Sequence, residues 1–498
     1  MLKKLLYIIS VFILTLYSCY EDKGSYDYID GDQYKVTISI LPVGVVPSLG
    51  EPAVFTPKLK FADQSDTMRY TYEYSFPKYG CVCRERNMSY VFDKPEIGKT
   101  MDGLFVVTDT VTSVRYYANV SVTYSSPYAV GWLILSDVNG KSVLDFVRMK
   151  QDAYETVPNL YGKLTGKELG THPYALSLNY MGMSHREPKQ FRIFQHGQEG
   201  SLLLDCSSYA QVSTVEEEFA GNAPLGFKPI FAAFSISGGW ILGNNGDLYS
   251  RSYKRNKLLN SSFVNVAADF RDGLNIQYLL YDSPARFLSN LIIYDQLNHR
   301  FLIVIGATYP GGEIYAVIPP TDLAATVPSP SALDGFVNHY SVLYGVNAYK
   351  GKCFSVLTDE VGAVCLYDFS FDTKTKKTSK VTLKRNTSIA SMLNVENARY
   401  QLLYNRPYLF FTSGVNQQLL YCYDRNANTY YLYKDFGKRI TDLKANYDDG
   451  YLSLAVGLEN GEFWLLDVKD EVLLQKGCNV LYNTKVDGKI VDVLYKNR

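Results

Sequence analysis

Histidine and carboxylate side chains carry most acid–base and metal chemistry in proteins, and in this chain their spacing indicates no catalytic site. The chain has 5 His, and none belongs to a two-histidine helical metal motif or follows a Gly-x-Ser-x-Gly turn. A glycoside hydrolase requires two carboxylates ~5 to 10 Å apart. A chain with 50 Asp and Glu residues contains such pairs by chance. The sequence therefore predicts no catalytic residue, no metal ligand and no cofactor. The histidines are His172, His185, His196, His299 and His339.

Eight cysteines offer thiol chemistry, and two pairs of them lie close in the sequence. Cys353 and Cys365 could face one another across a hairpin that turns near Asp359, which leaves a disulfide open as an alternative to two free thiols. Cys81 and Cys83 lie two residues apart on one face of a strand, where they cannot easily bond to each other. They lack the second pair or nearby histidine of a zinc site, so small buried hydrophobes are the favoured interpretation.

The first eighteen residues have the layout of a secretory signal. Lys3 and Lys4 precede an apolar run from Leu5 to Tyr17, and the segment contains no acidic residue. A membrane-spanning helix needs ~20 apolar residues, so a run of this length is too short to remain as an anchor. We expect residues 1–18 to be a signal peptide.

Cys19 is the residue with the most specific predicted modification. It follows Leu16, Tyr17 and Ser18, and the segment resembles the lipobox of bacterial lipoproteins, in which the cysteine thiol takes a diacylglycerol. Two or three acyl chains anchor a protein firmly, because each buried methylene contributes ~0.8 kcal/mol. Residues 19–34 are polar and have no apolar periodicity, which predicts a tether. We therefore expect attachment to a membrane through lipid on Cys19.

Acidic residues follow this cysteine closely, at Glu21 and Asp22. The arrangement resembles the export signal that sends some Gram-negative lipoproteins to the outer face of the outer membrane. The alternative is a tether that is merely solvated. The expected location is therefore the outer membrane, with the lipid-anchored chain at the cell surface.

The composition indicates a folded chain rich in β-structure. Among 498 residues, 47% are hydrophobic, and 50 basic side chains balance 50 acidic ones, which argues against a disordered protein or an electrostatically driven nucleic-acid binder. The chain has 43 Tyr, and strands favour aromatic residues.

Residues 35–127 alternate between apolar and polar side chains with period two. Examples are Val36, Ile38 and Ile40, and later Phe105 and Val107, and glycines and prolines separate these runs. This pattern predicts short antiparallel strands. About ninety residues of such strands suit a β-sandwich of immunoglobulin type, although the Cys, Trp, Cys signature of antibody domains is missing.

Residues 128–498 repeat a hairpin-like unit, which predicts a β-propeller. A four-stranded blade takes ~40 to 50 residues, so seven blades are expected, with six or eight as alternatives. Ile490 to Tyr495 could supply the strand that closes the ring, on the blade that holds Trp132. The units begin near Trp132, Phe191, Gly239, Asn290, Lys352, Tyr408 and Tyr451.

Several units carry one phrase, an apolar pair followed by an acid and a polar turn. The sequence then returns to apolar, strand-like residues. It occurs at Ile134–Asp137, Leu203–Asp205, Tyr294–Asp295, Leu366–Asp368, Tyr421–Asp424 and Leu465–Asp467.

Tryptophan and tyrosine side chains could stack on sugar rings or fill interface pockets. Because side chains alternate across a strand, packing between blades is favoured over ligand stacking for any one of them, and the ligand-binding residues remain unknown. The residues of interest are Trp132, Trp240, Trp464, Tyr421, Tyr423, Tyr430, Tyr431 and Tyr433.

Three segments together suggest a family. They are the lipobox with Tyr20–Tyr28, then Gly103–Asp109 with its Val-Thr-Asp phrase, then Gly131–Leu135 with its Gly-Trp phrase. Across its whole length the chain resembles the PKD-like family of bacterial lipoproteins. The resemblance implies a PKD-like sandwich before a C-terminal propeller. It also implies an accessory role in Sus-type uptake loci, beside a TonB-dependent receptor and its lid lipoprotein, and it supplies no catalytic residues.

The sequence leaves three functions open. The leading hypothesis is a non-catalytic binding or scaffolding protein that serves uptake of a glycan or peptide nutrient. The second is a propeller glycoside hydrolase or lyase that acts on extracellular polysaccharide, with acids converging in the central funnel. The third is a structural surface protein without a small ligand. Acids that meet in the funnel would favour the enzyme, and aromatic side chains exposed on one rim would favour the binder.

Overall fold

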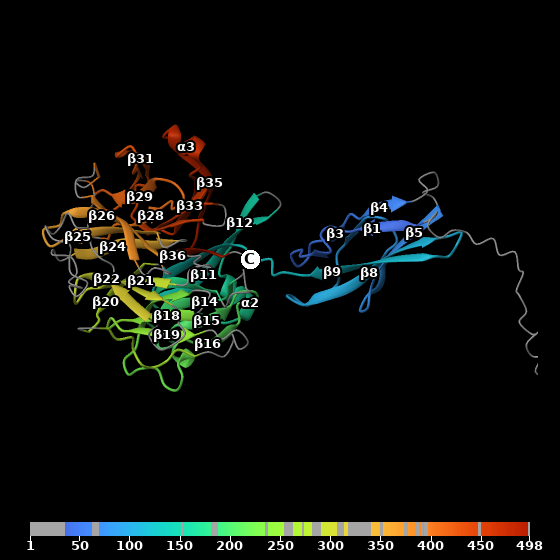
Figure 1. Cartoon of the computed structure of the whole chain (residues 1–498), viewed down its shortest axis with the longest axis horizontal. Helices are drawn as coiled ribbons and strands as arrows, with labels where there is room; N and C mark the ends of the chain where they lie inside the picture. Colours follow the sequence, from blue (N-terminus) through green and yellow to red (C-terminus); the bar gives the residue numbers. More distant parts are fainter. Residues whose placement is uncertain are drawn as a thin grey trace, which may run out of the picture. The chain divides into compact units, whose positions relative to one another are not determined.

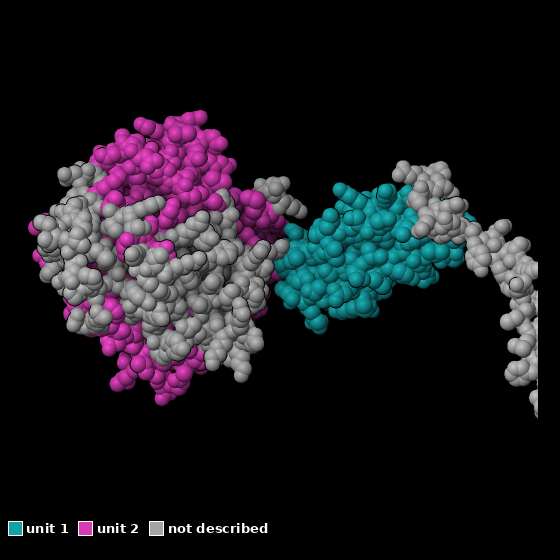
Figure 2. Space-filling model, in the orientation of Figure 1, with its two compact units in different colours: residues 1–125 teal, residues 126–498 magenta. Residues whose placement is uncertain are grey.

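The computed structural model divides into two compact units, residues 1–125 and residues 126–498, which Figure 2 colours separately. Cys19 and the rest of residues 1–34 lie outside the described part of the chain. No helix among the described residues is long and apolar enough to cross a membrane. The structure describes residues 35–61, 69–150, 153–180, 188–234, 238–252, 262–270, 273–280, 290–305, 313–316, 340–348, 352–372, 377–384, 388–389, 392, 397–446 and 450–496.

The first unit is a β-sandwich, as its alternating sequence predicted, and its strands pair antiparallel except for the short β2, which runs parallel to β9. Its main sheet has the strand order β2-β9-β8-β5-β6, and β1 pairs with β4 and β3 with β7. The strands are β1 (Val36–Ser39), β2 (Gly44–Val45), β3 (Ala53–Phe55), β4 (Lys58–Phe61), β5 (Tyr70–Phe76), β6 (Gly80–Cys83), β7 (Met88–Tyr90), β8 (Thr100–Asp109) and β9 (Arg115–Thr123).

Period-two alternation builds the core of this sandwich. In β8, Phe105 and Val107 are fully buried. Leu104, which directly precedes Phe105 and points to the opposite face of the sheet, is 40% exposed. Tyr74 on β5 lies opposite Phe105 in the register, and their ring centroids are 4.4 Å apart. The core therefore consists largely of aromatic side chains that face inward from neighbouring strands.

Asp109, the acid of the Val-Thr-Asp phrase, closes the turn after β8. Its two carboxylate oxygens accept bonds from Nε and Nη2 of Arg69, both at 2.6 Å, and Oδ1 also accepts from the Val111 amide at 2.9 Å. The Arg69 guanidinium holds the pKa of the Asp109 carboxyl well below its usual range. The phrase is therefore a structural feature of the sandwich.

The second unit is a β-propeller of seven sheets in its described part (Figure 1). The sheets have the strand orders β12-β11-β10-β36, β13 to β16, β17 to β19, β20 to β23, β24 to β27, β28 to β31 and β32 to β35. The strands of the first three sheets are β36 (Lys489–Lys496), β10 (Gly131–Val138), β11 (Lys141–Lys150), β12 (Ala153–Val157), β13 (Pro173–Tyr180), β14 (Pro188–Gln195), β15 (Leu202–Asp205), β16 (Gln211–Thr214), β17 (Pro229–Phe234), β18 (Gly238–Gly243) and β19 (Leu248–Ser252).

The other four sheets follow in chain order. Two short α-helices, α2 (Leu160–Thr165) and α3 (Asp470–Leu474), and a 3-10 turn, η3 (Glu216–Glu218), lie in connections. The strands are β20 (Ile276–Leu280), β21 (Asn290–Asp295), β22 (Arg300–Ile305), β23 (Glu313–Ala316), β24 (Tyr340–Ala348), β25 (Lys352–Asp359), β26 (Val364–Asp372), β27 (Lys377–Lys384), β28 (Tyr400–Leu402), β29 (Tyr408–Ser413), β30 (Leu419–Asp424), β31 (Thr429–Asp435), β32 (Ile440–Ala445), β33 (Ser453–Leu458), β34 (Glu462–Asp467) and β35 (Asn479–Lys485).

The seven predicted unit starts are confirmed, since each falls in or just before the second strand of a different sheet. The second strand of a sheet has a strand on each side. Its continuous run of apolar residues is therefore the clearest signal in each repeat. In β18, for example, every residue from Gly238 to Gly243 is buried.

The acid of this repeated phrase does not occupy the same position in every blade. Asp295 ends the second strand of its sheet, whereas Asp205 and Asp424 end third strands and Asp368 lies inside one. At strand ends the acid caps a turn, as at Asp424, whose Oδ1 accepts from the Asn426 amide at 2.9 Å. Turns at either end of a blade can use an aspartate in this way. The phrase therefore indicates a turn and does not identify which strand of the blade precedes it.

The last strand closes the ring, as predicted from Ile490 to Tyr495. Strand β36 pairs antiparallel with β10, with Tyr495 opposite Trp132 and Leu494 opposite Leu133. Figure 1 shows β36 among the strands of the first sheet although it ends the chain. The first and last parts of the propeller therefore stabilise one sheet together.

Lys496, the last residue of β36, is completely buried. Its ammonium donates to the Cys206 carbonyl at 2.5 Å and to the Tyr209 hydroxyl at 2.7 Å, and it has no carboxylate partner among the described residues. Burial lowers the pKa of Lys496 to about 8, because the charged form loses its hydration.

We expect Lys496→Met to stabilise the propeller at pH 7. Keeping a charge in this site costs about 3 kcal/mol, of which the two hydrogen bonds return part, so the net gain should be about 1 kcal/mol, or about 2 °C in Tm. Because the folded-state pKa is lowered, the wild-type protein gains stability as the pH rises from 8 toward ~10.4, and the advantage of the variant should vanish there. Thermal unfolding at pH 7 and pH 10 measures both effects. A variant less stable than wild type at pH 7 would contradict the argument.

Candidate functional site

One strand of each sheet lies on the inside of the propeller ring. These inner strands are β36, β13, β17, β20, β24, β28 and β32. Strand β36 lies against both β13 and β32, β13 lies against β17, β20 against β24, and β28 against β32. Side chains on these strands therefore line the central channel or bridge neighbouring blades.

A polar side chain on most inner strands reaches the backbone of the next inner strand. Six of these links join described residues, and all run in the same sense around the ring. The links are Asp492 Oδ2 to the Leu176 amide, Ser177 Oγ to the Ala232 carbonyl, Gln277 Oε1 to the Val342 amide, Tyr344 hydroxyl to the Leu402 amide, Arg399 Nε to the Thr441 carbonyl, and Asp442 Oδ2 to the Val493 amide.

Three charged side chains of this ring form one cluster in the channel. Lys444 Nζ lies 3.4 Å from Asp442 Oδ1 on the same strand and 3.6 Å from Asp492 Oδ1 on the closing strand. The second oxygens of the two acids accept the Val493 amide at 3.0 Å and the Leu176 amide at 2.6 Å. The Lys444 side chain is 40% exposed, which places it at the channel surface.

The electrostatics of the cluster favour one proton on the acid pair. Burial and the neighbouring Asp442 carboxyl raise the pKa of Asp492, although Lys444 opposes the shift. The two acids raise the pKa of Lys444, which therefore stays an ammonium. A proton on Asp492 reduces the repulsion between the two carboxyl groups.

The arrangement gives these acids a structural task. The ammonium stands between the two carboxyl groups, where a general acid and base would need a substrate or a water molecule. Backbone amides of the next blades hold their other oxygens. The funnel acids that would have favoured an enzyme do converge, and their partners are internal.

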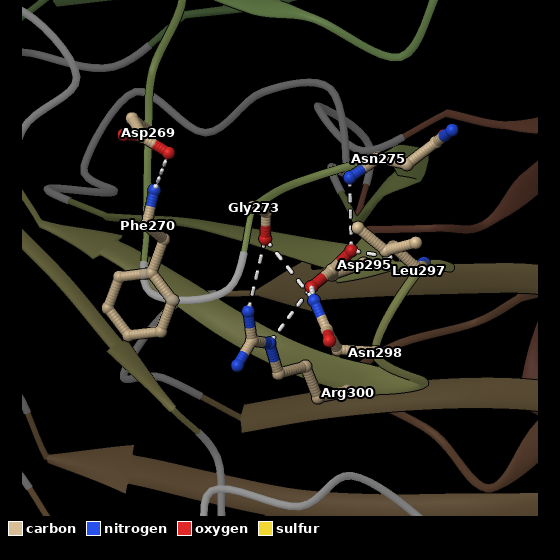
Figure 3. A network of polar contacts seen from close by, with 8 residues as sticks. All are labelled: Asp269, Phe270, Gly273, Asn275, Asp295, Leu297, Asn298 and Arg300. Carbon is tan, nitrogen blue, oxygen red and sulfur yellow. Dashed lines mark hydrogen bonds and ion pairs between the residues drawn. The ribbon is translucent and has the colours of Figure 1, made fainter.

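Asp295 anchors a second buried network, at the turn between β21 and β22 (Figure 3). Its Oδ2 accepts from Arg300 Nε and from Asn298 Nδ2, both at 2.9 Å, and its Oδ1 accepts the Asn275 amide at 3.1 Å. Arg300 and Asn298 also donate to the Gly273 carbonyl. Each member of this network has a partner, so the network fixes a turn and offers no open group.

An open cleft of about 410 Å³ lies elsewhere, at one end of the second and third sheets. The turn from β14 to β15 and the connection from β16 to β17 build it; both lie at the same sheet end because the strands alternate in direction. Its volume lies within the range of small-ligand sites, ~300 to 1,000 Å³. The lining residues are Gln195, His196, Gly197, Gln198, Glu199, Gly200, Thr214, Glu216, Phe227, Lys228 and Pro229.

The cleft combines carboxylates with ring surfaces. The His196 ring stacks on Tyr174, with centroids 4.3 Å apart and planes 19° apart. Partial burial raises the pKa of Glu216, and the neighbouring acids Glu217 and Glu218 add to this shift. We regard this cleft as the candidate ligand site.

The sequence did not single out the cleft or the channel cluster. Asp442 and Lys444 are two residues apart on a strand, so a shared face was a signal that could have been found. Asp492 joins them only through ring closure. The cleft brings together His196, which follows β14, and Glu216, which follows β16 of the same sheet, and the sequence carries no signal for this pairing.

The structure contradicts the disulfide alternative for Cys353 and Cys365. Cys353 lies opposite Phe369 and Cys365 opposite Leu357, and both are buried and outside any disulfide. The hairpin turns beyond Asp359, through residues 359–363, which moves the two cysteines four positions out of register.

Other sequence candidates have ordinary surroundings. Trp132, Trp240, Tyr423 and Tyr433 are buried, as the packing interpretation predicted, whereas Tyr430 is 38% exposed. No group of His, Cys, Asp and Glu able to hold a metal ion occurs in the described residues. His185 and His339 lie outside them.

Comparison with protein families bears on the N-terminal part of the chain. Residues 19–173 match the model of the PKD-like family. The chain contains a PKD-like family domain. The match includes Tyr20–Tyr28, Gly103–Asp109 and Gly131–Leu135, but it begins at Cys19 and so leaves out the rest of the lipobox. It ends at Pro173, the first residue of β13, whereas the resemblance was expected to span the whole chain.

Solved structures with similar folds are distant from this chain in sequence. A quinonprotein alcohol dehydrogenase-like protein from Bacteroides thetaiotaomicron has 12% identity and a TM-score of 0.42, over 92% of this chain and 99% of its own. A candidate 6-phosphogluconolactonase from Bacteroides uniformis has 12% identity and a TM-score of 0.46, over 74% and 99%. The Cps50 (Swd1) β-propeller domain of Myceliophteria thermophila has 10% identity and a TM-score of 0.36, over 66% and 87%. No curated protein matches the chain.

The protonated state of Asp492 yields a test. Asp492→Asn keeps an acceptor for the Leu176 amide and a neutral side chain, so it should fold normally. Because the folded-state pKa of Asp492 is raised, wild-type stability should fall as the pH rises from ~4 through the raised value. The asparagine variant should lack this decline. Tm measured for both proteins from pH 5 to pH 9 tests the prediction, and parallel curves would refute it.

Asp492→Ala supplies the control. It removes the acceptor and leaves the buried Leu176 amide without its partner, which should cost about 1 to 3 kcal/mol at every pH.

Proposed function

We propose that this PKD-like protein is a lipid-anchored, non-catalytic binding protein of the cell envelope. It would carry a ligand site on its propeller and serve nutrient uptake beside a TonB-dependent receptor and its lid lipoprotein. The observation that carries the proposal is a difference between two sets of polar groups in the propeller. The channel acids are engaged by Lys444 and by backbone amides, while the cleft beside Glu216 keeps its polar groups open.

The propeller enzyme is the second candidate, because Asp442 and Asp492 do meet in the channel. Against it, both acids have structural partners, and the shift in the pKa of Asp492 follows from burial beside Asp442. Perturbed acids of this kind occur in structural networks as well as in active sites.

A binding screen with product analysis separates the two candidates. We expect the full-length protein, purified in detergent, to bind a member of a glycan and peptide panel and to leave every member intact. Turnover that is lost in Asp442→Asn or Asp492→Asn, with Tm retained, would instead establish the enzyme. Binding to no member of the panel would refute the proposal in favour of a structural surface protein.

Anchoring depends on Cys19 in this proposal. Cys19→Ala should abolish incorporation of a labelled fatty acid and move the protein out of the membrane fraction, because the acyl chains supply the membrane affinity. Fractionation and labelling of cells that express each form measure the effect. Cys81→Ala, which changes an exposed thiol of the sandwich, is the control and should leave both readouts unchanged. Membrane retention of Cys19→Ala at the wild-type level would contradict the prediction.

The uptake role is tested in cells. Co-purification of the protein from crosslinked outer membranes should recover a TonB-dependent receptor or its lid lipoprotein. Failure to recover either one, from cells grown on a nutrient that the protein binds, would remove the uptake part of the proposal.

A further inference from the structure

The open cleft on the second and third sheets has more hydrogen-bond acceptors than donors. Glu199 and Glu216 both line it, and a Cβ built on Gly197 or Gly200 would meet their carboxylates at 2.4 and 3.0 Å. The two acids therefore lie over one short turn. The lining also includes Gln195, which is only 3% exposed and whose Oε1 has no hydrogen-bond partner among the described residues.

The nearby guanidinium groups are already engaged by a different acid. Glu218, two residues after Glu216, binds Nε of Arg192 at 2.7 Å and Nη1 of Arg251 at 2.9 Å. All three side chains are buried. Two guanidinium groups share the one carboxylate of Glu218. The pKa of Glu216 is nevertheless raised, whereas a cation in contact with it would lower that pKa.

Lys228 is the cation in the cleft lining, and it pairs with neither acid there. Its side chain is exposed, and no ion pair joins it to Glu199 or Glu216. Glu217, next to Glu216, adds a further negative charge and uses one oxygen to accept the Thr214 amide at 2.7 Å. Two carboxylates in the lining against one ammonium leave the cleft with an excess of negative charge.

Flat ring surfaces border these acceptors. The exposed His196 ring is stacked on Tyr174, and the half-buried Phe227 lines the same cleft. An aromatic face attracts a cation within ~6 Å, and a carboxylate forms its strongest hydrogen bonds with charged N–H donors. A group that is both cationic and rich in N–H donors would satisfy both features.

We propose that this cleft binds the cationic end of a small organic ligand, a primary ammonium or a guanidinium group. Glu199 and Glu216 accept its N–H groups, and the ring surfaces enclose its carbon chain. The inference rests on the proposed binding function and assigns that function a ligand chemistry. The same group occurs on an amino sugar of a glycan and on a lysine or arginine side chain of a peptide.

Calorimetric titration of the full-length protein in detergent tests the inference. The probes are agmatine for guanidinium, glucosamine for a sugar ammonium, and glucose as the neutral match. We expect agmatine or glucosamine to bind, at least about tenfold more tightly than glucose, and affinity to fall as salt is raised. Glucose binding as tightly as glucosamine would overturn the inference.

Variants locate the binding in the cleft. Glu216→Gln and Glu199→Gln should each weaken binding of the cationic probe about tenfold, because each removes a charge-assisted hydrogen bond. Lys228→Met should strengthen it about threefold by removing a competing cation. Glu168→Gln changes an exposed acid outside the cleft lining and should leave the affinity unchanged. Lys228→Met is expected to bind the probe more tightly and the glutamine variants less tightly, so the test still discriminates if one glutamine variant folds poorly. Unchanged affinity in all three cleft variants would overturn the inference.

Two further probes identify the source of the cation. A glucosamine oligosaccharide that binds more tightly than glucosamine itself supports a glycan, whereas a lysine- or arginine-containing peptide that binds more tightly than agmatine supports a peptide. A panel ligand whose affinity survives in the Glu199→Gln, Glu216→Gln double variant would refute the cation site and leave the binding function standing. Absence of any binding would refute the binding function itself.

Discussion

The propeller depends on hydrogen bonds that link each inner strand to the next. Sheets in such a ring share few backbone hydrogen bonds with their neighbours, so side chains must connect them. Asp492, Asp442 and Arg399 do so by bonding to the backbone of the following blade. Because every link runs in the same sense, the closing strand β36 must be in place before the first and last blades can complete their contacts.

This constraint explains why charged groups stand in the channel without implying catalysis. A buried carboxylate is costly unless it is paired or protonated. Lys444 pairs with both acids, and the raised pKa of Asp492 favours its protonated form. The buried pair of Asp295 and Arg300 follows the same rule at a turn. Acids near the axis are therefore a requirement of closure in this propeller, and they are a poor guide to its function.

The proposed ligand site lies instead in turns and connections at the sheet ends, away from the side chains that link the inner strands. The cleft beside Glu216 lies in such connections. Glu218 pairs with Arg192 and Arg251 in the core, while Glu216 faces the cleft without a cation of its own. Glu216 and Glu218 belong to the same short 3-10 turn, η3. The turn points their side chains in different directions, so that one binds buried arginines and the other lines the cleft.

The sequence by itself determined the elements whose signal is local. Period-two alternation predicted the sandwich, and the apolar second strands at Trp132 and Gly239 marked the seven blades. Local patterns failed where two places look alike, since a turn-capping acid such as Asp424 serves either end of a hairpin. Only the tertiary structure brought Asp492 to Lys444 and Glu216 to His196. The first pair joins two sheets through ring closure, and the second joins the ends of two strands of one sheet through strand register. No single segment of the sequence specifies either contact.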